Sequence, residues 1–235
     1  MGIYGGLKPE DWKRWGQFTT FKSNAAELLR REVRSGQIIY CSPLVDPYQP
    51  AEEAAQMMPR ILDALLESPP RVFTIQTRGP LILRDLDRFR VLAERTTLRV
   101  SFSITTNREE IRRLYEPHCA GFEERLAVVR TLREAGIETY ATLAPLLPCD
   151  PEVLASAAIE ATGRDLIGDP LHIRATKRQG ATTREAAFKI GAAHGHDDYL
   201  DAAHQARVVE QIDAVAREAG FTFTTGPRGF ARLAL

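Results

Sequence analysis

Short apolar runs alternate along the chain with longer segments in which apolar residues recur every three or four positions. The runs are rich in Val, Ile, Leu and Thr and are bounded by turn-forming residues, which is typical of buried strands. We therefore predict strands within residues 37–44, 71–77, 98–106, 137–148 and 164–173, and a last short strand within 221–225.

The segments between the runs have the period of amphipathic helices. Several begin with a residue that can cap a helix: Ser23 or Asn24, Asn107, and Asp150 with a proline behind it at the favoured first position. Pro59 lies inside another segment, where it would kink the helix or occupy its first turns. We predict helices over residues 22–36, 51–68, 83–95, 107–115, 122–136, 150–162 and 205–220.

This order of strand and helix predicts an α/β fold with parallel strands joined by right-handed crossovers. A doubly wound sheet and a (β/α) barrel, whole or partial, both fit the alternation. Residues 176–205 break the rhythm because they are polar and interrupted by glycine. We place a barrel-like unit at residues 1–175 and an irregular, helix-rich C-terminal extension that packs on it at 176–235.

The charge and the cysteine content of the chain reduce the number of function classes that fit it. The 235 residues hold 31 basic and 31 acidic side chains, so the chain has no general attraction for DNA or for an anionic membrane. Its three cysteines, Cys41, Cys119 and Cys149, are too scattered for a disulfide framework. No apolar run reaches membrane-spanning length and the start has no signal-peptide core, so we expect a cytoplasmic protein without membrane contact.

Polar side chains follow three of the predicted strands. Asp46, Tyr48 and Gln49 lie between two prolines after the first, Thr77 and Arg78 end the second, and Ser103 and Thr105 end the third. Because the carboxyl ends of parallel strands meet at one edge, where ligands bind, we expect these groups to gather there. The alternative is that strand ends are polar because they meet water.

Familiar catalytic motifs are missing from the sequence. It has neither a Gly-rich phosphate loop nor a Gly-x-Ser-x-Gly elbow. Residues 194–204 contain closely spaced histidines and aspartates, which are residue types that bind metals. A solvated loop explains this composition better, so we predict no metal site in this chain.

Five blocks of the sequence resemble, in order, the radical S-adenosylmethionine proteins related to spore photoproduct lyase, also described as DNA-repair-photolyase-like. "LVDPYQPAE" is similar to the Thr-Asp-Pro-Tyr-Gln-Pro-x-Glu segment of that group. The other blocks are "FKSNAAELLRREV", "IQTRGPLILRDLD", "VSFSITT" and "YEPHCAGFEERLAVVRTLREAGIETYATLAPLLP", and the resemblance covers roughly residues 15–175. It implies a partial TIM-type barrel.

One departure from the family pattern matters more than the matches. The family holds a [4Fe–4S] cluster on a Cys-x-x-x-Cys-x-x-Cys loop after its first barrel strand, and this sequence contains no such loop. Its three cysteines cannot replace the loop by their spacing. We expect that Met1 is an internal methionine of a longer reading frame whose upstream part carries the first strand and the cluster loop. Otherwise the chain is a degenerate relative.

The resemblance implies an enzyme that cleaves S-adenosylmethionine reductively to a 5′-deoxyadenosyl radical, which abstracts hydrogen from a substrate that the sequence does not identify. It implies that Ser103 and Thr105 bind the ribose, that Arg125 binds the methionyl carboxylate, and that Ala144 and Pro145 flank the adenine. The remaining residues implied near cofactor or substrate are Asp46, Tyr48, Gln49, Thr77, Arg78 and Glu116. Two residues also have simpler interpretations, because Asp46 can stabilise its own turn and Arg125 can pair with Glu116 or Glu123 on the surface.

Other functions stay open at this point. The chain alone fits an inactive, truncated form of such an enzyme, or a non-catalytic partial barrel that binds a nucleotide-like ligand or a protein partner. A partial barrel would expose the strand within residues 37–44 as an edge, which invites self-association. DNA as a substrate has no support from the charge. An ordinary TIM-barrel enzyme is disfavoured because the strand ends carry no carboxylate pair or nucleophile set.

Overall fold

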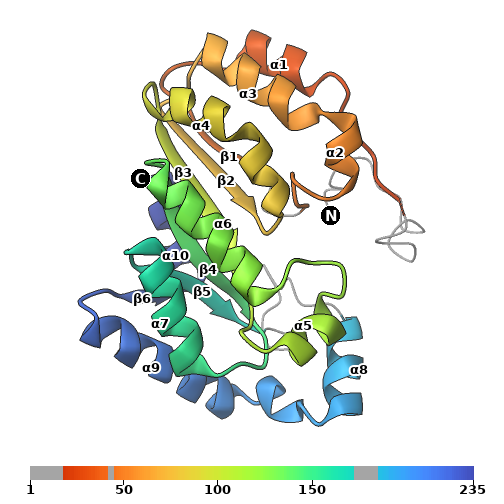
Figure 1. Cartoon of the computed structure of the whole chain (residues 1–235), viewed down its shortest axis with the longest axis vertical. Helices are drawn as coiled ribbons and strands as arrows, with labels where there is room; N and C mark the ends of the chain where they lie inside the picture. The colour runs from red at the N-terminus through yellow and green to blue at the C-terminus, as the bar shows by residue number, and fades with distance from the viewer. Residues whose placement is uncertain (1–17, 42–44, 172–184) are drawn as a thin grey trace.

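A six-stranded, all-parallel sheet forms the centre of the molecule, as the sequence predicts (Figure 1). The structure is a computed structural model, and it describes residues 18–41, 45–171 and 185–235. The strands lie side by side in the order of the sequence. They are β1 (Ile38–Cys41), β2 (Val72–Thr77), β3 (Thr97–Ser103), β4 (Glu138–Leu146), β5 (Leu166–Pro170) and β6 (Phe223–Thr225).

Helices follow the strands in the predicted alternation. They are α1 (Ala25–Glu32), α2 (Ala51–Ala55), α3 (Met57–Glu67), α4 (Leu86–Ala93), α5 (Glu109–Tyr115), α6 (Phe122–Glu134), α7 (Pro151–Thr162), α8 (Glu185–His194), α9 (Ala202–Glu218) and α10 (Gly226–Ala231). Shorter 3-10 helices are η3 (Pro80–Asp85), η4 (Asp197–Leu200) and η5 (Arg232–Ala234).

One face of the sheet carries the main hydrophobic core. Phe73 and Ile75 of β2 and Phe102 of β3 are fully buried there and pack in one cluster with Leu65 of α3 and Phe89 of α4. Figure 1 shows α3, α4, α6 and α7 on the viewer's side of the strands, and α9 continues this layer by packing on α7. The alternating apolar positions of the strands therefore anchor the helices.

The opposite face of the sheet is polar. Tyr40 donates a hydrogen bond to Gln76 (3.1 Å), and the hydroxyls of Ser101 and Thr142 lie 2.5 Å apart. The C-terminal segment lies against this face, because the carbonyl of Leu233 accepts hydrogen bonds from the Thr74 hydroxyl at 2.5 Å and from the Arg99 guanidinium at 3.4 Å. Both faces are thus covered over at least part of the sheet.

Residues 176–235, predicted as an extension, contribute the sixth strand, so the sheet continues across the boundary placed at residue 175. Tyr199 of η4 ties this part to the segment that follows β4. Its hydroxyl accepts a hydrogen bond from the Cys149 amide at 3.0 Å and donates one to the Cys149 carbonyl at 3.1 Å.

Several local predictions are corrected. The helix predicted over 51–68 is two helices, separated at Gln56, whose φ of 49° is left-handed; Pro59 lies in the first turn of the second. Asn107 does not cap α5, because its side chain accepts a hydrogen bond from the Asp150 amide instead. Neither Ser23 nor Asn24 caps α1 through its side chain.

Other predictions hold. Asp150 caps α7 by accepting a hydrogen bond from the Val153 amide at 3.1 Å, with Pro151 behind it. Parts of the strand predictions at 42–44 and 172–173, and the first part of the loop predicted at 176–205, lie outside the described residues. Within the part of the chain that the structure describes, each helix is too short or too polar to cross a membrane.

Candidate functional site

The carboxyl ends of neighbouring strands meet around the carboxylate of Asp46. This residue opens the Asp-Pro-Tyr-Gln-Pro loop after β1. Its Oδ1 accepts hydrogen bonds from the Tyr48 amide (2.9 Å) and from the Thr77 hydroxyl (2.6 Å), while Oδ2 accepts one from the Arg78 amide at 2.8 Å. Asp46 therefore stabilises its own turn and also fixes that turn to the end of β2.

The loop after β1 and the end of β2 come unusually close together. A Cβ atom added at Gly79 would lie 2.4 Å from the carbonyl oxygen of Tyr48, which is backbone and cannot move aside alone. Only glycine allows this approach. Asp46 holds the two segments together by its hydrogen bonds, and Gly79 allows them to lie this close.

Glu116, in the turn after α5, is the second centre of the site. Its carboxylate forms ion pairs with Arg78, which follows β2, and with Arg125 of α6, the latter at 2.5 Å. It also accepts a hydrogen bond from the Thr105 hydroxyl at 2.9 Å. Arg125 in turn donates to the Ser103 carbonyl and to the Thr105 hydroxyl, both at 3.3 Å, and to the Ala120 carbonyl at 2.9 Å.

The Glu116 carboxylate stays charged in this setting. Burial alone would raise the pKa of the Glu116 carboxyl, but the guanidinium groups of Arg78 and Arg125 hold that pKa below its ordinary value. The side chains of Glu116 and Arg125 are only 7% and 2% exposed, whereas that of Arg78 is 32% exposed. Arg78 is therefore the cation of this group that reaches solvent.

The structure joins most of the sequence-predicted residues in one place. Asp46, Thr77 and Arg78 form one hydrogen-bonded group, and Arg78 links it through Glu116 to Thr105 and Arg125. Eight of the predicted residues belong to this network through side chain or backbone: Asp46, Tyr48, Thr77, Arg78, Ser103, Thr105, Glu116 and Arg125.

Only some of the predicted residues are accessible to a ligand. Ser103, Thr105 and Arg125 are buried, and the Thr105 hydroxyl and the Arg125 guanidinium already contact each other and Glu116. These residues support the edge of the sheet, and a ligand would have to displace existing contacts to reach them. Arg78 and Gln49 are half-buried and reach solvent.

Tyr48 also has a contact beyond this network, and Gln49, Ala144 and Pro145 are not part of the network described above. Tyr48 is 2% exposed and donates its hydroxyl hydrogen to Asp85 at 3.0 Å, so it packs the loop onto η3. Gln49 accepts a hydrogen bond from Thr19 at 3.5 Å. Ala144 and Pro145, joined by a cis peptide bond, are half-buried near the end of β4.

Cys119 is a neighbour of the site that the sequence prediction did not include. Burial and the Glu116 carboxylate raise the pKa of its thiol, while Arg78 and Arg125 act in the opposite direction. The signal in the sequence is its position three residues after Glu116 in the same turn, where its amide donates to the Glu116 carbonyl at 3.0 Å.

The residues present do not fit an iron–sulfur cluster. Burial raises the pKa of the Cys41 thiol to about 12 and that of the Cys149 thiol to about 11, and the pKa of Cys119 is raised as well. Iron deprotonates a thiol when it binds, so the arrangement of the cysteines decides whether they fit a cluster. Among residues 18–41, 45–171 and 185–235, no three His, Cys, Asp or Glu side chains are grouped as a metal site would require.

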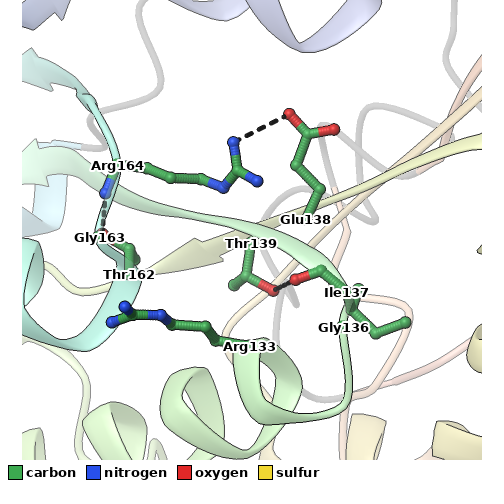
Figure 2. Close-up of a pocket in the computed structure, with 8 residues that line it drawn as sticks. All are labelled: Arg133, Gly136, Ile137, Glu138, Thr139, Thr162, Gly163 and Arg164. Carbon is green, nitrogen blue, oxygen red and sulfur yellow. Dashed lines mark hydrogen bonds and ion pairs between the residues drawn. The ribbon is translucent and has the colours of Figure 1, made fainter.

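A polar pocket of about 340 Å³ lies at the opposite, amino edge of the sheet (Figure 2). Figure 2 shows Arg133 and Arg164 reaching across it from either side of Thr139, with Arg164 directed toward Glu138. Arg133 donates to the Glu160 carbonyl at 2.9 Å and so caps the end of α7, and Arg164 pairs with Glu138 at 3.5 Å. Both arginines have structural partners, which makes this pocket a weaker ligand site.

Comparison with known proteins gives relatives without an assigned activity. An uncharacterized protein of Mycobacterium tuberculosis is 31% identical over 169 residues, which are 67% of this chain and 49% of that protein. An uncharacterized protein of Methanocaldococcus jannaschii is 28% identical over 138 residues, which are 59% and 51%. An uncharacterized protein of Acidianus two-tailed virus is 29% identical over 145 residues, which are 60% and 39%.

The match to these relatives is partial. The chain spans about half the length of the curated cellular relatives it matches. No family model matches the chain, and no solved structure matches it.

Proposed function

We propose that this chain is the part of a radical S-adenosylmethionine protein, of the group related to spore photoproduct lyase, that binds S-adenosylmethionine and substrate. The observation that carries the proposal is the network at the carboxyl edge. It links the segments that follow β1, β2 and β3 through Asp46, Arg78 and Glu116. This edge is where parallel α/β folds bind their ligands.

The strand order supports the finer proposal of a partial TIM-type barrel. A doubly wound sheet reverses its strand order at a switch point, whereas the strands here run from β1 to β6 without reversal. Sequential parallel strands with helices on the outer face are the arrangement of a barrel. The polar inner face, with Tyr40, Gln76, Ser101 and Thr142, is consistent with it.

The role of this chain within such a protein is binding and positioning. When a reduced cluster is bound in proteins of this group, it supplies the electron that cleaves S-adenosylmethionine. The cysteines present here do not fit that cluster, so its ligands would have to come from polypeptide outside this chain. No step of the radical chemistry is therefore assigned to residues of this chain.

Arg78 is the residue best suited to contact an anionic ligand group. Its guanidinium is 32% exposed, and the buried Glu116 carboxylate holds one of its nitrogens in place. A planar guanidinium that is fixed in this way binds a carboxylate with little further loss of freedom. Gln49, Ala144 and Pro145 offer accessible surface for the remainder of an adenosine-like ligand.

The test is direct binding of S-adenosylmethionine to the purified chain by isothermal titration calorimetry. We expect saturable binding that weakens at least tenfold in Arg78→Met. The matched control is Arg90→Met, since Arg90 is an exposed arginine that pairs with the exposed Asp87 on α4. Absence of saturable binding, or equal loss in both variants, would refute the proposal.

A second candidate function is a non-catalytic partial barrel that binds a nucleotide-like ligand or a protein partner. The arrangement of the three cysteines favours it, because none of them belongs to a group of metal-binding side chains within the part of the chain that the structure describes. Adenosine binding without S-adenosylmethionine preference would support it. We further propose a cytoplasmic location, since the three cysteines are free.

A further inference from the structure

Two blocks of the sequence that are far apart in the chain meet beside the loop after β1. Tyr48 and Glu52 belong to the block "LVDPYQPAE", and Arg84 and Asp85 belong to the block "IQTRGPLILRDLD". The Tyr48 hydroxyl donates a hydrogen bond to Asp85 Oδ2 at 3.0 Å. Nη2 of Arg84 donates to the same oxygen at 2.8 Å and to Glu52 Oε1 at 3.0 Å. These residues form one connected group, which we call the Arg84 network.

Both carboxylates of the Arg84 network are buried, and Arg84 pairs with each of them. The side chains of Asp85 and Glu52 are 0% and 2% exposed, whereas that of Arg84 is 22% exposed. Arg88 approaches the other Asp85 oxygen at 3.5 Å, but its closer partner is Asp63 at 2.8 Å. A buried carboxylate requires a partner that compensates for its lost hydration. Arg84 is therefore the cation that joins the two buried carboxylates.

The Arg84 network is anchored in the outer helices. The Glu52 carboxylate accepts hydrogen bonds from the amides of Met57 (3.1 Å) and Met58 (2.8 Å), so it satisfies the first N–H groups of α3. Nη1 of Arg84 also donates to the Glu52 carbonyl at 3.3 Å. Arg84 itself lies on η3, which follows β2. The network thus fixes the start of α3 and η3 relative to each other.

Tyr48 connects the Arg84 network to the carboxyl edge. Its ring centre lies 5.9 Å from the guanidinium carbon of Arg84, a cation–π contact, and burial together with Asp85 raises the pKa of its hydroxyl. Its backbone belongs to the candidate site. The Tyr48 amide donates to Asp46 at 2.9 Å, and its carbonyl oxygen is the atom that a Cβ at Gly79 would meet at 2.4 Å. A shift of the Tyr48 ring therefore moves the peptide groups that hold the loop to the end of β2.

We propose that Arg84 is a positioning residue for the ligand site, because it holds Tyr48 and thereby the loop after β1. Asp46 of that loop in turn fixes the Arg78 amide at 2.8 Å. The net stability gained from a buried ion pair is small, since lost hydration offsets the attraction, whereas its directional hydrogen bonds define one arrangement of the groups. Where it names S-adenosylmethionine as the ligand, the inference rests on the proposed function.

The alternative is that the Arg84 network only stabilises the packing of α3 on η3. The two explanations differ in what a conservative change does to the folded protein. Arg84→Lys keeps the charge but loses the planar fork that reaches both carboxylates. Under the proposal, the loop after β1 loosens while the rest of the fold is kept. Under the alternative, the free energy of unfolding falls and the loop of the folded protein is unchanged.

The test compares hydrogen–deuterium exchange of the unliganded full chain with that of Arg84→Lys and Tyr48→Phe. Peptides that cover residues 45–50 and 77–80 should exchange about tenfold faster in each variant, the factor expected for losing a hydrogen bond to a charged group. The double variant should exchange no faster than the faster single variant, because both substitutions break the same chain of contacts. Peptides from α9 should be unchanged. The matched control is Arg90→Lys, since the exposed Arg90 pairs with Asp87 on the neighbouring α4.

Tyr48→Phe leaves the ion pairs of Arg84 in place, so it decides the question if Arg84→Lys fails to fold. The proposal is overturned if the folded variants exchange at residues 45–50 and 77–80 as the wild type does. It is also overturned if the increase extends equally to α9 or occurs in Arg90→Lys.

Calorimetric titration with S-adenosylmethionine gives a second readout. Its affinity should fall about tenfold in Tyr48→Phe, and an unchanged affinity in a variant whose loop exchanges faster would overturn the proposal. If the wild type does not bind S-adenosylmethionine, the proposed function fails. The exchange measurement then still decides whether Arg84 positions the loop.

Discussion

Replacing Glu116 by glutamine tests whether the carboxyl edge is held by buried charge. The substitution keeps the size of the side chain and removes its charge. Arg125, whose side chain is 2% exposed, then loses the partner that lies 2.5 Å away. The glutamine amide can accept from one guanidinium only and presents its own N–H groups to the other.

The expected cost is large for a change of so few atoms. Removing one member of a buried ion pair leaves the other charge without compensation and costs about 3–5 kcal/mol. This is a substantial part of the roughly 5–15 kcal/mol that stabilises a typical domain. Urea denaturation at pH 7 should show this loss of unfolding free energy in Glu116→Gln.

The matched control is Glu67→Gln. Glu67 also accepts two hydrogen bonds from an arginine, Arg30, at 2.9 Å each, but its side chain is 56% exposed. An exposed pair contributes about 0–1 kcal/mol. If Glu116→Gln loses no more free energy of unfolding than Glu67→Gln, the reasoning about buried charge at this edge is wrong.

The wild type and Glu116→Gln also allow a test of how stability depends on pH. The folded-state pKa of Glu116 is held below its ordinary value of 4.5, so its contribution is fully present above that value. The contribution is lost as pH falls through the lower folded-state pKa. The difference in stability between wild type and Glu116→Gln should therefore be constant near neutral pH and shrink in strongly acidic solution. A difference that grows as the pH falls would contradict this assignment.

Two other substitutions test how the site is attached to the sheet. Gly79→Ala should displace the loop after β1, because the new methyl group would lie 2.4 Å from the Tyr48 carbonyl oxygen. Faster proteolysis of that loop, with the helices retained, is the expected result, and unchanged proteolysis would contradict it. Tyr199→Phe should cost about 1–3 kcal/mol in urea denaturation, because it leaves the buried Cys149 amide without its acceptor. A loss of less than about 0.5 kcal/mol would contradict this and show that water replaces the hydroxyl.

The sequence predicted the alternation of elements well because the underlying signal is local. Apolar runs such as that containing Phe73 and Ile75 become buried strands, and Asp150 caps α7 where its spacing predicts. The failure at Asn107 comes from a contact between distant parts of the chain. Asn107 resembles a helix cap in sequence, but its side chain bonds to the Asp150 amide, a residue 43 positions away that no local pattern reveals.

The sequence predicted which residues gather at the site, but not which of them are buried. Parallel strands bring their carboxyl ends to one edge, so the gathering of Asp46, Thr77 and Arg78 followed from the fold class. The pair of Arg125 with Glu116 was one of the alternatives offered by the sequence, but it was expected on the surface, and the structure places it inside the protein. Burial depends on how α6 packs on the sheet, which is a tertiary property.

The most direct test of the central claim is hydrogen–deuterium exchange of the chain with and without S-adenosylmethionine, read by mass spectrometry. The account predicts ligand-dependent protection in peptides that cover residues 45–50, 77–80 and 144–147, at the carboxyl edge. Protection confined to peptides around Arg133 and Arg164, at the amino edge, or no protection at all, would contradict it.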